Sequence, residues 1–411
     1  MKQNEKEIKR QRSDRVMALF ESSSLISRLV SVLMLTFSVS PKINICLGLN
    51  NRHEAEQTPP FFIFGDSFLD AGNNNYINTT ALDQANFWPY GISFFHTPTG
   101  RFSDGRLISD FLGKRFCRAN SDLISSAEHA NLPLIPPYLQ PASKLSQVPH
   151  GVNFASSGAG ALVQTFRGSV INLHEQLKNY KKVEEWLKHK LGKMKARRKL
   201  TSAVHLFSIG SNDYISLFMT NSTLLTAYTQ SQYVNMVTSN ITSVVHEIYK
   251  IGGRKMVFLN LPPIGCFPAL RMRNESGECL METSSYTKLH NEALIQALRQ
   301  LAERLPAFKY SLHDFYSSTL QRINQPLQYG YTEGTTACCG TGKFRGVFSC
   351  GGKRPVKQYE LCNNVDEHVF WDSFHFTEKV YMQIAYDMWS SSDNTPYFYG
   401  SHSIKDLFSS P

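Results

Sequence analysis

The chain has 411 residues, of which 42% are hydrophobic and 18% are charged, a composition that fits a globular protein with a sizeable core. Its formal net charge of +10 is concentrated in two places, with +4 in residues 1–48 and +8 in Lys178–Lys199, which leaves the remainder near −2. Because the charge is confined to a leader and one local stripe, the composition argues against a nucleic-acid binder.

The first 48 residues have the pattern of a secretory signal region. A polar, basic stretch over residues 1–28 precedes an apolar run of 11 residues, Leu29–Val39. That run is shorter than the roughly 20 residues that cross a bilayer. We therefore expect cleavage between about residues 40 and 51, a secreted protein and no stable transmembrane anchor. An uncleaved anchor is the alternative.

Apolar runs with strand character alternate with helical patterns through the rest of the chain. The strands are expected at 61–65, 151–154, 203–209, 255–261 and 308–315, and the helices at 107–112, 172–199 (one amphipathic helix and its exit), 231–251, 283–305 and 377–389. The alternation predicts a mainly parallel sheet of about five strands with helices on both faces. We expect one domain over residues 58–395, followed by a C-terminal tail over 396–411.

The run Phe61–Gly65 ends in Gly-Asp-Ser, which brings Ser67 to the carboxyl end of the first strand. In open parallel sheets, ligands bind at that end. Ser67 is therefore a candidate nucleophile. The alternative is that Asp66 and Ser67 only turn the chain or cap a helix.

Two later strands also end in small or polar residues, at Gly158 and at Asn212. The carboxyl ends of parallel strands share one edge of a sheet, so both residues are expected near Ser67. Asp372 stands three residues before His375 in a turn that enters a helix, a spacing that presents both side chains on one side. A lone Asp-x-x-His is more often structural. Together, however, these residues fill every role that a serine hydrolase needs.

Four Asn-x-Ser/Thr sequons and eight cysteines fit passage through the secretory pathway. The expected glycosylation sites are Asn78, Asn221, Asn240 and Asn274. Cys266 and Cys279 flank a short loop and are expected to pair. A second cluster, which allows three pairings, consists of Cys338, Cys339, Cys350 and Cys362. A zinc site in this cluster is the alternative, disfavoured because the chain has no Cys-x-x-Cys pair.

Several blocks resemble plant-type GDSL esterase/lipases of the SGNH hydrolase superfamily. They are Phe64–Asn74, Gly100–Arg106, Gly151–Gly160, Gly210–Asp213, Leu261–Cys266, Cys338–Gly342 and Asp372–His375, and they cover nearly the whole mature chain. Two positions depart from the pattern, because Ser157 stands where many members have Gly and Phe376 where many have Pro. The Gly-x-Ser-x-Gly elbow of α/β-hydrolases is absent around Ser67.

The resemblance implies a flavodoxin-like three-layer α/β/α sandwich, the SGNH hydrolase fold, and a set of residue roles. Ser67 would be the nucleophile, His375 the base and Asp372 the group that orients the base. The oxyanion would be held by the N–H groups of Ser67 and Gly158 and by the side-chain amide of Asn212. No metal or cofactor is implied.

The expected function is therefore that of a secreted carboxylic-ester hydrolase that acts on a small-molecule or lipid acyl ester. For a plant protein, its location would be the apoplast or the cell wall. An acyltransferase with the same acyl-enzyme and a catalytically silent accessory protein are the alternatives. Five aromatic residues either line an acyl pocket or pack in the core and loops. They are Phe87, Trp88, Tyr90, Phe94 and Phe95.

Overall fold

The computed structural model describes residues 58–113, 132–141, 150–220, 222–390 and 397–410. The expected signal region therefore lies outside the described residues, as do Cys117 and the sequon at Asn221. Within the described residues, no helix is both long and apolar enough to span a membrane.

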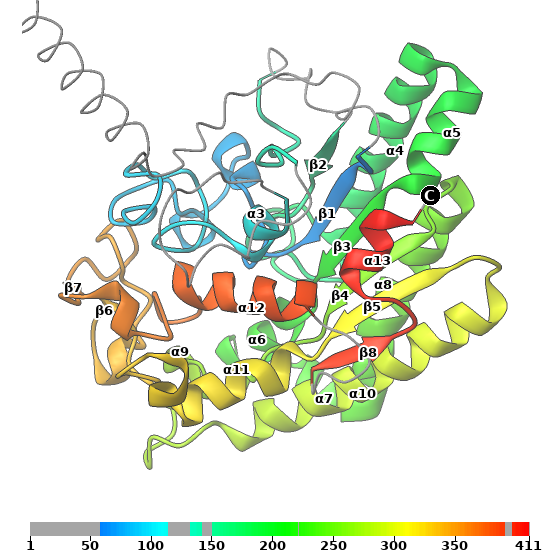
Figure 1. Cartoon of the computed structure of the whole chain (residues 1–411). Coiled ribbons are helices and arrows are strands. Elements are labelled where there is room, and N and C mark those ends of the chain that lie inside the picture. The colour runs from blue at the N-terminus through cyan, green and yellow to red at the C-terminus, as the bar shows by residue number, and fades with distance from the viewer. Residues whose placement is uncertain (1–57, 114–131, 142–149, 221, 391–396, 411) are drawn as a thin grey trace, which may run out of the picture. The chain divides into compact units, whose positions relative to one another are not determined.

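A six-stranded sheet forms the centre of the described structure (Figure 1). In spatial order its strands are β2 (Gly151–Asn153), β1 (Phe61–Gly65), β3 (Val204–Ser208), β4 (Lys255–Leu259), β5 (Lys309–His313) and β8 (Phe398–Gly400). The first five are parallel, and β8 pairs antiparallel with β5. The order 2-1-3-4-5 is that of flavodoxin-like folds, so the expected fold class is confirmed.

Helices cover both faces of the sheet (Figure 1). The α-helices of the described residues are α3 (Ile108–Gly113), α4 (Leu173–Leu191), α5 (Lys193–Ser202), α6 (Ser211–Met219), α7 (Leu224–Ala227), α8 (Gln230–Ile251), α9 (Pro268–Arg271), α10 (Met281–Arg304), α11 (Phe315–Asn324), α12 (Glu378–Ser390) and α13 (Ile404–Ser409). α4, α8 and α10 pack side by side, and α12 packs against α3 and α13.

Two adjacent residues of β1 show how the layers are arranged. The Phe61 ring lies 5.4 Å from Phe408 of α13, and the Phe62 ring lies 5.2 Å from Tyr180 of α4. Neighbouring side chains along a strand point to opposite faces, so α13 and α4 cover opposite faces of the sheet. All five residues of β1 are buried, as expected for a strand covered on both sides.

The segment 396–411 differs from the expected tail. Residues 398–400 form the edge strand β8, and α13 buries Ile404, Leu407 and Phe408 against the core. This spacing of i, i+3 and i+4 is helical, and Ser403 and Asp406 form a capping box at the start of the helix. The described domain therefore includes residues beyond 395.

The segment 172–199, expected to be one amphipathic helix and its exit, contains two helices. α4 ends at Leu191, and α5 begins at Lys193 after Gly192, whose φ of +79° breaks the helical path. Helices α6 and α11, which follow β3 and β5, were not expected from the sequence. The remaining expected strands and helices are present, with small shifts at their ends.

The short elements lie mostly in the loops. They are the antiparallel pair β6 (Cys339–Gly340) and β7 (Glu360–Leu361) and the 3₁₀ turns η1 (Asn73–Tyr76), η2 (Ala81–Asp83), η4 (Ile264–Cys266), η5 (Pro326–Tyr329), η6 (Lys343–Arg345) and η7 (Val365–Glu367).

Three disulfides fasten the loops within the described residues. The expected pair Cys266–Cys279 is confirmed, and the second cluster pairs as Cys338–Cys362 and Cys339–Cys350. This pairing uses all four sulfur atoms of the cluster, which leaves no thiolate there for zinc.

Candidate active site

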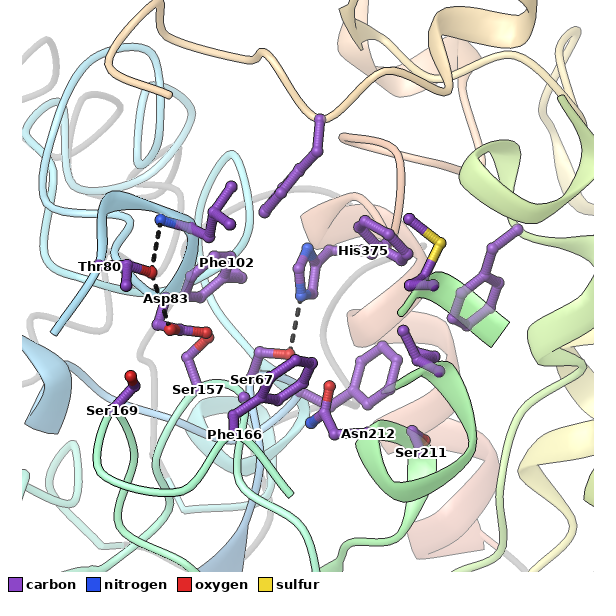
Figure 2. A pocket seen from close by; sticks show the side chains of 18 of the residues that line it. Ser67, Thr80, Asp83, Phe102, Ser157, Phe166, Ser169, Ser211, Asn212 and His375 are labelled. Atoms are coloured by element: carbon purple, nitrogen blue, oxygen red, sulfur yellow. Dashed lines mark hydrogen bonds between the residues drawn. The ribbon is translucent and has the colours of Figure 1, made fainter. Parts of the chain in front are cut away.

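Three side chains form one line of hydrogen bonds, Ser67 from near the start of the described chain and Asp372 and His375 from one turn near its end. Ser67 Oγ lies 2.8 Å from His375 Nε2 (Figure 2). On the other side of the ring, His375 Nδ1 lies 2.8 Å from Asp372 Oδ1 and 3.0 Å from Oδ2. Ser67 and His375 are 7% and 5% exposed, and Asp372 is fully buried. The order of hydroxyl, imidazole and carboxylate is the one that activates a serine nucleophile.

The position of Ser67 follows from the strand before it. β1 pairs with β2 on one side and with β3 on the other, and Ser67 follows its last residue, Gly65, after Asp66. This place between β1 and β3 is the switch point of a flavodoxin-like sheet, where ligands are expected. A Cβ added to Gly65 would stand 2.3 Å from the Ser208 carbonyl oxygen, so only glycine fits at the end of the strand.

The turn that carries the acid and the base is organised by the carboxylate of Asp372. Its Oδ1 accepts hydrogen bonds from the backbone N–H groups of Phe374 and His375, both at 2.9 Å. The His375 carbonyl accepts a 2.8 Å hydrogen bond from the Trp371 N–H. One short turn thus holds the carboxylate and the imidazole in a fixed relation.

A buried tyrosine completes the surroundings of Asp372. Tyr90 Oη donates a 2.6 Å hydrogen bond to Asp372 Oδ2. The guanidinium of Arg354, also buried, lies 5.3 Å from the centre of the Tyr90 ring. Burial raises the pKa of Asp372, but His375, Arg354 and the Tyr90 hydroxyl outweigh it, so the pKa lies below its ordinary value. The carboxylate is therefore kept ionised.

Three possible hydrogen-bond donors border the same pocket as Ser67. They are the backbone N–H groups of Ser67 and Gly158 and the side-chain amide of Asn212. Within the described ranges, no protein group accepts a hydrogen bond from either N–H. One hydrogen of the Asn212 amide is used on the Ala159 carbonyl at 3.0 Å, which leaves the other.

Gly158 has a conformation and surroundings that exclude a side chain. Its φ is +77°, a left-handed value that favours glycine. A Cβ at this position would stand 2.5 Å from Asp83 Oδ1 and 2.8 Å from Val170 Cγ1. The backbone of residue 158 can therefore approach a ligand closely only because it is glycine.

Two buried carboxylates connect the loops that bear these donors. Asp70 Oδ2 accepts a 2.9 Å hydrogen bond from the N–H of Ser157, and its Oδ1 accepts from Gly72 and Asn73, both at 2.7 Å. Asp213 accepts from the N–H groups of residues 161 and 162. Burial raises the pKa of both carboxyls to about 6. These contacts hold the Gly158 loop against the segments that carry Ser67 and Asn212.

The pocket above Ser67 has a volume of about 500 Å³. Much of its lining is apolar and consists of Phe68, Leu82, Phe102, Phe166, Ile215, Met219, Phe267, Phe348 and Phe374. None of the five aromatic residues considered from the sequence lines it. Phe87 and Tyr90 pack in a small buried cluster instead, and Trp88 is 55% exposed.

The structure brings all five predicted site residues together, because Ser67, Gly158, Asn212 and His375 line the pocket and Asp372 lies behind His375. The contacts of Tyr90 and Asp70 with this group were not predicted from the sequence. Asp70 stands in the first family block, but nothing in its local pattern shows that it bonds residue 157. Tyr90 meets Asp372 across 282 positions of the chain, a separation that leaves no periodic signal.

The expected glycosylation sites lie in different surroundings. Asn78 is exposed in a loop, as an acceptor needs. Asn274 is partly buried in a turn and bonds the Glu278 carbonyl. Asn240 lies inside α8, where its amide bonds the Met236 carbonyl and His174. These contacts disfavour attachment at Asn240, and modification of the other two stays a prediction.

Comparison with known proteins gives a consistent result. Residues 61–388 match the family model described as GDSL-like Lipase/Acylhydrolase. The chain is 52% identical to GDSL esterase/lipase 5 of Arabidopsis thaliana over 85% of this chain and 87% of the relative. It is 45% identical to GDSL esterase/lipase 1 of the same plant, over 93% and 98% of the two chains. A GDSL lipase of Tanacetum cinerariifolium is 42% identical over 84% and 87%.

Proposed function

The chain belongs to the GDSL-like lipase/acylhydrolase family, a family of carboxylic-ester hydrolases, and from this premise we propose that it cleaves acyl esters with Ser67 as nucleophile. The observation that carries the proposal is the line of hydrogen bonds from Ser67 Oγ through His375 to Asp372 at the floor of an apolar pocket. The residue roles below rest on this geometry and on the chemistry of serine hydrolases.

In the first half of the reaction, Ser67 Oγ attacks the ester carbonyl carbon and His375 Nε2 takes its proton. The carbonyl oxygen becomes an oxyanion, which the N–H groups of Ser67 and Gly158 and the amide of Asn212 stabilise. The C–O bond to the alcohol then breaks. His375 returns the proton to the departing alcohol, and the acyl group stays on Ser67.

In the second half, water enters beside His375. The imidazole takes a proton from it as the water oxygen attacks the acyl carbon. A second oxyanion forms and collapses, the acid departs, and Ser67 regains its proton. Asp372 stays ionised throughout and stabilises the charged imidazolium that forms in each half.

We further propose that the protein is secreted into the extracellular space. The support is the leader pattern of residues 1–48 and the sequons, together with three disulfides that need an oxidising compartment. Immunolocalisation of the full-length chain, and of a chain without residues 1–48, tests this. Retention of the full-length protein in the cytosol would contradict it.

The nucleophile is tested with a serine-reactive fluorophosphonate on the purified protein. Wild type should be labelled, Ser67→Ala should not, and His375→Ala should react far more slowly. Equal labelling of wild type and Ser67→Ala would refute the assignment. Product analysis with an ester alone, and then with an added alcohol, separates hydrolysis from acyl transfer. A catalytically silent protein would show no labelling at all.

A further inference from the structure

The pocket has a second, polar wall that the proposed chemistry does not use. It consists of Thr80, Asp83, Ser157, Arg167 and Ser169. Figure 2 shows Thr80, Asp83, Ser157 and Ser169 on one side of Ser67, with Asn212 on the other side. An acyl chain needs only the apolar lining, so the polar wall faces a different part of the substrate.

Asp83 places a carboxylate on this wall. Its Oδ2 accepts hydrogen bonds from the Thr80 and Thr79 hydroxyls at 3.0 and 3.3 Å, and its carbonyl accepts one from Asn74 Nδ2 at 2.8 Å. The other oxygen, Oδ1, points towards Gly158, since a Cβ added there would stand 2.5 Å from it. A carboxylate oxygen is thus held beside the position where the ester would react.

Ser157 adds a hydroxyl to the same wall. Its backbone is fixed on both sides, because its N–H donates to Asp70 Oδ2 at 2.9 Å and its carbonyl accepts from Asn74 Nδ2 at 3.0 Å. Within the described part of the chain, no protein group bonds its hydroxyl, which faces the pocket.

The charges on this wall point to a neutral ligand. Asp83 and Arg167 carry opposite charges, so the wall has little net charge to attract an anion or a cation. Its hydroxyls and its carboxylate oxygen instead match several hydroxyl groups, each of which can both donate and accept.

We propose that the polar wall binds the alcohol part of the ester and that this alcohol is a neutral polyol, such as glycerol or a sugar. The inference rests on the proposed function. Asp83 Oδ1 accepts from one hydroxyl of the polyol, and Ser157 Oγ exchanges a hydrogen bond with a second. The acyl chain then lies along the apolar lining near Ile215 and Met219.

The test uses three butanoate esters that share one acyl group, namely methyl butanoate, glycerol 1-monobutanoate and glucose 6-butanoate. We expect kcat/KM of wild type for the two polyol esters to exceed that for the methyl ester by about tenfold or more. In Asp83→Asn this ratio should fall about fivefold, because an amide oxygen accepts more weakly than a carboxylate. Ser157→Ala should lower the ratio by a smaller factor.

Glu175→Gln is the matched control, since it makes the same acid-to-amide change on the exposed side of α4 and should keep the wild-type ratio. Equal kcat/KM for the three esters in wild type, or a preference for the methyl ester, overturns the inference without touching the proposed function. So does an unchanged ratio in Asp83→Asn that is labelled normally by fluorophosphonate. No hydrolysis of any ester, together with no labelling of Ser67, overturns the proposed function and this inference with it.

Discussion

The hydroxyl of Tyr90 donates a 2.6 Å hydrogen bond to Oδ2 of Asp372, the carboxylate that faces Nδ1 of His375. Both partners are fully buried. The acid of the site is thus held by the imidazole on one side and by a phenol on the other, with the charge of Arg354 nearby. Tyr90 touches no reacting atom and acts through Asp372 as a positioning residue.

Tyr90→Phe should lower kcat by about tenfold with little change in KM, because the Asp372 carboxylate loses a charge-assisted hydrogen bond that fixes its orientation. The fold should lose about 1–3 kcal/mol of unfolding free energy, as expected for a buried hydrogen bond to a charged group. Steady-state kinetics and urea denaturation measure the two effects.

Tyr180→Phe is the matched control for that substitution. Tyr180 is an equally buried tyrosine whose hydroxyl bonds His205 Nε2 at 2.9 Å, away from the site. The Tyr180→Phe variant should have a lower unfolding free energy than wild type and the same kcat. If both variants lose kcat alike, Tyr90 has only a structural role.

Asn212→Ala should lower kcat by about 10²–10³-fold and change KM little, because the lost amide donor acts mainly on the oxyanion in the transition state. Asn364→Ala removes a comparable side chain from an exposed turn and should leave the kinetics unchanged. A loss of less than about threefold in Asn212→Ala would remove this amide from the oxyanion site.

Gly158→Ala should abolish most of the activity, because its Cβ would collide with Asp83 Oδ1 and Val170 and displace the backbone N–H. Gly168→Ala separates this collision from backbone strain. Gly168 has a similar φ of +86°, but a Cβ there meets nothing within 4 Å. The Gly168→Ala variant should lose about 1–2 kcal/mol of unfolding free energy, because alanine is strained in the left-handed conformation, and it should keep the wild-type kcat. Equal activity of the two variants would contradict the proposed place of Gly158.

Burial raises the pKa of Asp66 from 3.8 to about 8, and its Oδ2 has no hydrogen-bond partner among the described residues. The folded protein therefore holds this proton up to about pH 8, while the unfolded chain releases it near pH 3.8. The folded state binds more protons between these values, so stability falls as the pH rises through that interval. Burial also raises the pKa values of three other carboxyls to about 6, namely those of Asp70, Asp104 and Asp213. Above pH 6.5 these three change the unfolding free energy with pH less than Asp66 does.

We expect the unfolding free energy of wild type to fall by on the order of 1 kcal/mol per pH unit between pH 6.5 and 8. Asp66→Asn resembles the protonated acid and should show a flatter profile over the same range. Urea denaturation at several pH values measures both. Parallel profiles for the two proteins would show that Asp66 is ionised in the fold.

The sequence predicted those elements that have a local signature. Phe61–Gly65 and the other parallel strands are short apolar runs that end at turn residues, and these runs place Ser67 and Asn212 at one edge. β8 was missed because three residues are too few to show an alternating pattern. The helix α5 after Gly192 was missed because only Ala196 and Leu200 are buried in it, too few apolar positions to show a helical period.

The contacts that order the site were harder to foresee than its members. The roles of Ser67 and His375 are suggested by their motifs, but the partners of Tyr90 and Asp83 depend on long loops whose course has no periodic pattern. Buried polar side chains in such loops become interpretable only when their hydrogen bonds can be followed in three dimensions.

Deletion of residues 397–411 tests the C-terminal elements. It removes β8 from the edge of β5 and uncovers Phe61, which Phe408 contacts. Because several buried apolar side chains are lost together, we expect a loss of more than about 5 kcal/mol and little soluble protein. Phe408→Ala should be milder, at about 3–5 kcal/mol. Wild-type stability of the truncated chain would show that this segment is dispensable.

The two disulfides of the 338–362 loop have a consequence for when activity arises. The N–H groups of Cys338 and Cys339 bond the carbonyls of Phe370 and Trp371, immediately before Asp372. The parallel strands, which carry Ser67, contain no cysteine of this loop. A chain folded in a reducing environment would therefore have its nucleophile in place while the acid and the base stood on an unfastened loop. The disulfides thus fasten the loop that bonds the segment before the acid and the base, whereas the sheet alone places Ser67.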